Sequence, residues 1–248
     1  MLLYLCSLFG LIAGLLIGAA GIGGVILVPL LVYFAGIDIH TSIAASVAAF
    51  FVSGLVGTVT YSKRGVILWP DFVAISSGAI PGALLATHVL PKIESYFLTF
   101  FIALVLMISA VKQFTDTKRS NPSRPTQNIP KYQLALVGLV TGFLSVLSGT
   151  GGPLVLLPLL NLLSTPLLTA IGLSQVIQLP IATFASIGNA VNSLIDWQLV
   201  MVLSFGIAFG SFIGAKGSEH LPIAYIKILV SILLLLSGFY MVISLLFG

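Results

Sequence analysis

The sequence predicts an all-α integral membrane protein made of two inverted repeats of five helical segments, each with a GxGG-interrupted hairpin near the midplane. Three observations carry this prediction: the composition, a pair of glycine-rich breaks, and a constant spacing between matching residues of the two halves. Hydrophobic residues make up 58% of the 248 residues, charged residues 6%, and the mean hydropathy is +1.20. Soluble domains carry about 25% charged residues, so this chain cannot cover a water-facing surface.

Apolar runs separated by polar, glycine or proline residues predict ten helical segments. Eight are long enough, or nearly so, to cross a hydrocarbon core that needs about 20 residues. Two span only about half of that thickness at roughly 1.5 Å per residue, and each follows a break, AAGIGG (19–24) or SGTGGP (148–153). Asp71 and Asp196 are expected to act as helix N-caps. The ten segments are 2–20, 25–35, 41–61, 72–90, 96–114, 132–147, 153–163, 167–191, 197–216 and 223–247.

The two halves of the chain repeat at a constant offset of 128 positions. Glycine, tryptophan and polar residues coincide over roughly seventy residues, which indicates an internal duplication. We therefore expect a first repeat at 1–114, a cytoplasmic linker at 115–131 and a second repeat at 132–248. The matched pairs are Gly10/Gly138, Gly14/Gly142, Gly21/Gly149, Gly23/Gly151, Gly24/Gly152, Thr41/Thr169, Ser46/Ser174, Trp69/Trp197, Gly78/Gly206 and Gly82/Gly210.

The basic residues predict how the chain crosses the membrane, because lysine and arginine favour cytoplasmic loops. With the linker inside, Lys92 is the only one of ten basic residues left outside, and both termini lie outside. Since each half has an odd number of segments, the halves are inverted. We expect a multi-pass protein of the inner cell membrane that contacts the lipid bilayer and does not bind nucleic acid. Small-xxx-small glycine faces would allow a homodimer.

The glycine breaks predict an anion site. A helix that breaks inside a membrane leaves unpaired N–H groups at the start of its second piece, and in lipid these must line a cavity or meet a ligand. The helix dipole favours an anion there, and glycine allows a sharp turn and close approach. The alternative role of these glycines is tight helix packing. The candidate ligand-binding residues of the two breaks are Gly21, Gly23, Gly24, Ser148, Gly149, Thr150, Gly151 and Gly152.

Polar residues inside the apolar segments extend the candidate site. Gln175 and Gln178 begin a stripe on the eighth segment, which Pro180 is expected to kink. They would contact the substrate or form interhelical hydrogen bonds. Ser46 and Ser174 would donate to the ligand or bond to their own helix backbone. The pattern shows no metal cluster, no buried carboxylate and no cofactor site.

The paired AAGIGG and SGTGGP breaks, the duplicated halves and the length resemble the sulfite exporter TauE/SafE family of membrane permeases. The resemblance covers essentially the whole chain, and it implies movement of sulfur-containing anions such as sulfite or an organosulfonate. We expect a secondary transporter that exports a small anion, and not an enzyme. The alternatives are an anion channel, an accessory subunit, or an intramembrane enzyme in which Ser148 would need a base within hydrogen-bond reach.

Overall fold

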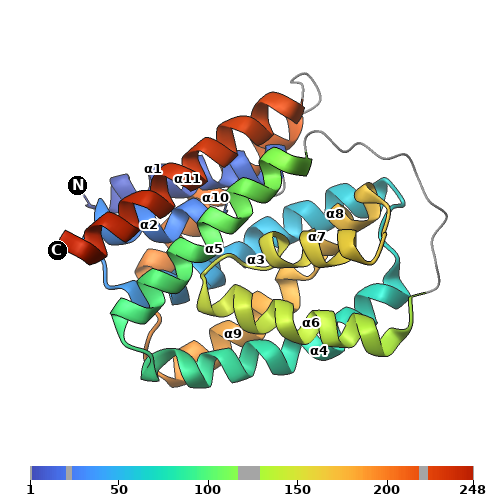
Figure 1. The fold of residues 1–248 in the computed structure, drawn as a ribbon, viewed down its shortest axis with the longest axis horizontal. Coiled ribbons are helices and arrows are strands. Elements are labelled where there is room, and N and C mark those ends of the chain that lie inside the picture. The colour runs from blue at the N-terminus through green and yellow to red at the C-terminus, as the bar shows by residue number, and fades with distance from the viewer. Residues whose placement is uncertain (1, 21–23, 117–128, 218–222, 248) are drawn as a thin grey trace.

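The computed structural model describes residues 2–20, 24–116, 129–217 and 223–247, and every regular element within them is a helix. Figure 1 shows α5 and α11 side by side across one face of the bundle. The elements are α1 (Leu2–Ala20), the 3-10 turn η1 (Gly24–Ile26), α2 (Leu27–Tyr33), α3 (Ile39–Lys63), α4 (Trp69–Val89), the 3-10 turn η2 (Leu90–Lys92), α5 (Ser95–Asp116), α6 (Lys131–Leu147), α7 (Pro153–Leu162), α8 (Leu167–Val176), α9 (Gln178–Val191), α10 (Trp197–Gly217) and α11 (Ile223–Phe247).

The helix boundaries follow the sequence prediction within a few residues, and two details have clear local causes. The predicted segment 167–191 is divided at Ile177, because Pro180 has no N–H to bond the carbonyl of Val176. Asp196 caps α10 by accepting the N–H of Leu199 at 3.0 Å. The expected Asp71 cap is wrong. Pro70 is accommodated in the first turn of α4, so this helix starts before Asp71 and its N-cap is Leu68.

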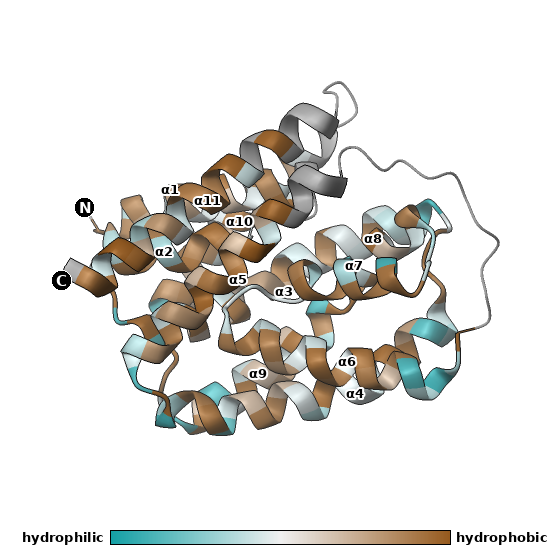
Figure 2. Cartoon of the chain, in the orientation of Figure 1, coloured by the Kyte–Doolittle hydropathy of each residue, from teal (hydrophilic) through white to brown (hydrophobic). Residues whose placement is uncertain are grey.

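The described helices have the composition of a membrane protein. Four stretches are long and apolar enough to cross a membrane, namely Ile39–Lys63, Trp69–Lys92, Leu167–Val191 and Trp197–Gly214. Six shorter apolar stretches hold 10–17 described residues and include the two half-length segments, Gly24–Tyr33 and Pro153–Leu162. Within the described residues, four of the eight predicted spans therefore meet the length and hydropathy requirement. Figure 2 shows hydrophobic residues along the helices and hydrophilic residues mainly near their ends.

Helix packing joins the two halves of the chain. The helix α1 packs on α10, and α4 packs on α6. At the offset of 128 residues, α1 corresponds to α6 and α10 to α4, so the two contacts are equivalent. Glycine permits this close approach: a Cβ atom at Gly10 would lie 2.7 Å from the carbonyl oxygen of Leu203, and one at Gly14 would lie 2.6 Å from that of Ile207. The packing role of these glycine faces is confirmed, and the faces are occupied within the chain.

The same contacts give the relative directions of the helices. Gly10 faces Leu203 and Gly14 faces Ile207, so α1 and α10 run parallel. Along α3, Gly54 faces Gln178 whereas Gly57 faces Gln175, so α3 runs antiparallel to α8 and α9. This matters for the site, because α3 corresponds to α8 and α9 at the offset of 128 residues and its facing side chains include the predicted glutamines.

Candidate functional site

The second glycine break has a backbone that only glycine adopts easily. Between α6 and α7, the φ angles of Gly149, Gly151 and Gly152 are 66°, 76° and 125°. The carbonyl of Gly152 accepts the N–H groups of Val155 and Leu156 at 3.1 and 3.0 Å, so helical bonding starts there. Among the described residues, the N–H groups of Gly151 and Gly152 donate no hydrogen bond. The break thus opens α7 with unpaired donors, as a helix N-terminus does.

The first break is described in part. Gly21 and Gly23 lie outside the described residues, and their predicted role stays a prediction. Gly24 is buried and opens the turn η1 that leads into α2.

The two breaks lie close together around the ring of Phe50. A Cβ atom at Gly24 would lie 2.5 Å from Phe50 Cζ, and one at Gly151 would lie 2.6 Å from Phe50 Cδ2. A Cβ atom at Gly149 would lie 2.5 Å from Cγ2 of Val28, in α2. Phe50 is fully buried and takes up the space between Gly24 and Gly151. The sequence contains no indication of this position for Phe50, because an aromatic residue in an apolar helix is typical of ordinary core packing.

A buried chain of hydrogen bonds lies beside the breaks. Ser53 Oγ donates to Gln178 Oε1 at 2.6 Å, and Gln178 Nε2 donates to Gln175 Oε1 at 2.9 Å. All three side chains are at most 3% exposed. Gln178 therefore forms the interhelical hydrogen bond that was expected as the alternative to a substrate contact. Ser53 was missed. Its signal was its spacing: it lies seven residues after Ser46, on the same face of α3.

The predicted hydroxyl groups divide into two kinds. Ser148 Oγ donates to the Leu144 carbonyl at 2.7 Å and lies 3.0 Å from Thr150 Oγ1, so Thr150 donates to Ser148. Ser174 Oγ donates to the Ile171 carbonyl at 2.8 Å. These three hydroxyls are satisfied by the backbone or by each other. Ser46 is fully buried and its Oγ has no hydrogen-bond partner, so it is the one predicted hydroxyl left for a ligand within the described structure.

The histidines in the described ranges do not approach these groups as bases. His40 Nε2 lies 2.9 Å from the Ile93 carbonyl oxygen, and His88 Nε2 lies 2.9 Å from Lys92 Nζ. The Ser148 hydroxyl donates its hydrogen to the backbone carbonyl of Leu144 and not to a base. Among the residues that the structure describes, no group of three His, Cys, Asp or Glu side chains is placed to hold a metal ion.

A polar pocket lies next to the buried hydrogen-bond chain. Its lining comes from Ile17 and Gly18 of α1, from α3 between Ser53 and Arg64, from Gln175 of α8 and from Ser211 of α10.

Half-length helices that begin at glycine breaks, within a bundle of apolar spanning helices, are features of membrane transporters. The family pattern of Sulfite exporter TauE/SafE matches residues 6–241, and the chain belongs to this family. It is a membrane transporter of the TauE/SafE type, and the resemblance noted in its sequence is confirmed.

Relatives with curated names agree with this assignment. The chain is 25% identical over 226 residues to the probable membrane transporter protein YdhB of Bacillus subtilis, covering 89% of this chain and 90% of that protein. It is 23% identical over 261 residues to the probable membrane transporter protein MJ0441 of Methanocaldococcus jannaschii, covering 97% and 96%. It is 27% identical over 236 residues to the probable membrane transporter protein y4hK of Sinorhizobium fredii, covering 90% of each. A comparison with solved structures finds no match.

Proposed function

We propose that this protein is a secondary transporter that exports a small sulfur-containing oxyanion, such as sulfite or an organosulfonate, and binds it at the two glycine breaks. The observation that carries the proposal is that both breaks contact Phe50, with Gly24 against the tip of its ring and Gly151 against the end that bears Cβ. One break opens α7 with unpaired N–H donors, and Ser46, one helical turn before Phe50, adds an unpartnered hydroxyl. The donors suit an anion, and none of them adds a fixed charge.

The proposal includes an inverted repeat, with residues 1–114 and 132–248 as the two units and 115–131 as the linker. Two features support it. The contact of α1 with α10 corresponds to the contact of α6 with α4 when the units are exchanged. The helix α3 also runs antiparallel to its own counterpart, α8 and α9. Two repeats related by an axis along the membrane normal would run parallel at this contact, whereas inverted repeats run antiparallel.

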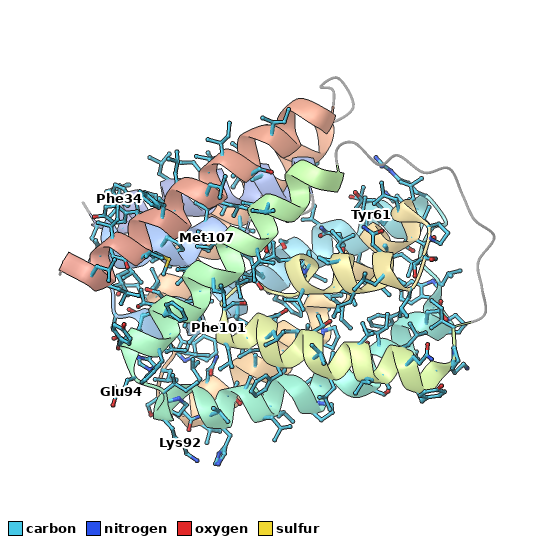
Figure 3. All side chains as sticks on the ribbon, viewed as in Figure 1. Phe34, Tyr61, Lys92, Glu94, Phe101 and Met107 are labelled. Atoms are coloured by element: carbon cyan, nitrogen blue, oxygen red, sulfur yellow. The ribbon has the colours of Figure 1, made fainter. Side chains whose placement is uncertain are left out.

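The proposed topology has both termini outside and the linker in the cytoplasm. In Figure 3, Lys92 and Glu94 lie at the opposite end of the molecule from Tyr61, which is two residues before Lys63. Figure 1 shows the first turn of α1 and the last turn of α11 at one end, with α6 beginning at the other. These positions support a basic cytoplasmic face near Tyr61 and an outer face that carries Lys92.

The experiment is efflux of radiolabelled sulfite from proteoliposomes under anaerobic conditions. Gly151→Ala should abolish saturable flux, because the new Cβ atom meets the Phe50 ring and closes the approach to the N–H donors. Gly36→Ala is the matched control: its φ angle is 66° against 76° for Gly151, but a Cβ atom there meets nothing within 4 Å. Both variants place alanine at a positive φ angle, and they differ in the contact that the new Cβ atom makes.

Normal flux in Gly151→Ala would remove the break from the substrate site. An absence of saturable flux in the wild-type protein, for sulfite and for simple organosulfonates alike, would overturn the proposed substrate class.

A further inference from the structure

The pocket between α1, α3, α8 and α10 has the chemistry of an oxyanion site. Its polar lining includes Ser53, Thr60, Tyr61, Arg64, Gln175 and Ser211. The lining residues carry one formal charge, the Arg64 guanidinium, and no carboxylate. The lining residues from α3 run from Ser53, which bonds Gln178, to Arg64 just after the helix, a span of about 16 Å at 1.5 Å per residue. The lining thus reaches from beside the buried glutamines to the end of α3 that carries the basic residues.

The buried part of the pocket holds hydrogen-bond donors. Ser211 is 2% exposed, lines the pocket, and its hydroxyl has no partner among the described residues. Gln175 accepts from Gln178 through its Oε1, and its side chain lines the pocket. Ser53 is held by its bond to Gln178. A buried hydroxyl without a partner costs free energy, which an oxyanion or a water molecule in the pocket would recover.

The exposed end of the pocket carries the Arg64 guanidinium. Arg64 is exposed at the end of α3, and its guanidinium carbon lies 5.4 Å from the centre of the Tyr61 ring. The cation–π contact holds the guanidinium beside the opening. Guanidinium stays charged at every physiological pH, and its forked N–H groups match the geometry of an oxyanion. An anion that approaches from the basic face therefore meets Arg64 before it meets the buried amides.

The corresponding positions of the other half are closed. At the offset of 128, Tyr61 and Arg64 correspond to Asn189 and Asn192. Asn189 is fully buried, and Asn192 Nδ2 donates to the carbonyl of Thr87 in α4 at 2.9 Å. The counterparts of Gln175 and Ser211 are Val47 and Ala83, and both are fully buried. In the described structure, a pocket thus opens beside Arg64, whereas side chains fill the corresponding region around Asn189 in the other half.

We propose that this pocket is a cytoplasmic vestibule that binds a small oxyanion on its way to the glycine breaks, with Arg64 at its mouth and Ser211 at its base. The proposal rests on the proposed function and deepens it, because it adds a cationic subsite to a transport site without fixed charge. Arg64 would raise the local anion concentration and select anions over neutral solutes.

The test measures the half-saturating sulfite concentration in proteoliposomes of pure phosphatidylcholine, for the wild type and for variants. Arg64→Gln should raise it about tenfold, the effect of one lost charge-assisted hydrogen bond, and should reduce its dependence on ionic strength. Ser211→Ala should raise it several-fold without changing the salt dependence. Lys63→Gln is the matched control, since it removes the same charge one residue away but does not line the pocket; it should change the value less than twofold.

Each outcome bears on one claim. Saturable wild-type flux with equal behaviour of Arg64→Gln and Lys63→Gln would overturn the vestibule and leave the proposed function standing. No saturable wild-type flux would overturn the proposed function itself. A lipid headgroup has the same oxyanion chemistry, so the series is repeated with phosphatidylglycerol added. An Arg64→Gln effect that appears only with this anionic lipid would assign the guanidinium to lipid and overturn the vestibule.

Discussion

Replacing Gln178 by leucine tests whether the buried amide joins α3 to α9. The change removes the oxygen that accepts from the Ser53 hydroxyl at 2.6 Å and the N–H group that donates to Gln175 Oε1 at 2.9 Å. Each buried partner left unsatisfied costs about 1–3 kcal/mol. Ser53 can turn to a carbonyl of its own helix, so most of the loss comes from the hydrogen bond that Gln178 Nε2 donates to Gln175 Oε1. We therefore expect a destabilisation of about 1–3 kcal/mol.

A double-mutant cycle isolates the contact. Ser53→Ala, Gln178→Leu and the double variant are unfolded by titration with sodium dodecyl sulfate in mixed micelles. Interhelical hydrogen bonds inside membrane proteins couple by about 0.6 kcal/mol on average and up to about 1.7 kcal/mol, and this buried pair should fall in that range. Thr183→Val is the control, because its hydroxyl bonds to the Leu179 carbonyl of its own helix. Additive free energies for Ser53→Ala and Gln178→Leu would refute the inferred link between α3 and α9.

Two further predictions concern topology and the outer face. Reporter fusions within 118–124 should report the cytoplasm and fusions after the last helix should report the outside; a cytoplasmic C-terminus would contradict the inverted repeat. Asn189 is fully buried with neither amide atom bonded, and its counterpart Tyr61 lines the open pocket. In a Cys6→Ser background, Asn189→Cys should react with an external, membrane-impermeant maleimide faster during sulfite turnover than at rest, and equal rates would exclude an outward-opening state at this position.

Much of the fold could be predicted because local chemistry determines it. The break at 148–153 follows from glycines that adopt positive φ and from a proline that suits the first helical position. The division at Ile177 follows from the missing N–H of Pro180. The small-xxx-small faces predict close helix contacts. They do not name the partner, and the crossing of α1 to α10 between the two halves is set by tertiary packing.

The candidate site could be predicted only in part. The glycines gave the position of the breaks, and the glutamine spacing gave the polar face of α8 and α9. Phe50 and Arg64 were out of reach, since the role of each depends on distant helices. A phenylalanine in an apolar helix looks like core, and an arginine at a helix end looks like a topology signal. Their places between two breaks and at a pocket mouth appear only once the chain is folded.

Energy coupling is the last prediction, and it follows from where the charges lie. The carboxylates whose side chains are described, Asp38, Asp71, Glu94 and Asp196, lie at helix N-termini or in the loop before α5. An inside-negative potential of 100 mV is worth about 2.3 kcal/mol per charge, or roughly a fifty-fold outward gradient of a monovalent anion. We therefore expect electrogenic sulfite efflux that needs no proton or sodium gradient. A potassium–valinomycin potential without a pH gradient should drive it. Efflux that follows an imposed pH gradient and ignores the potential would show instead that the substrate moves with a proton.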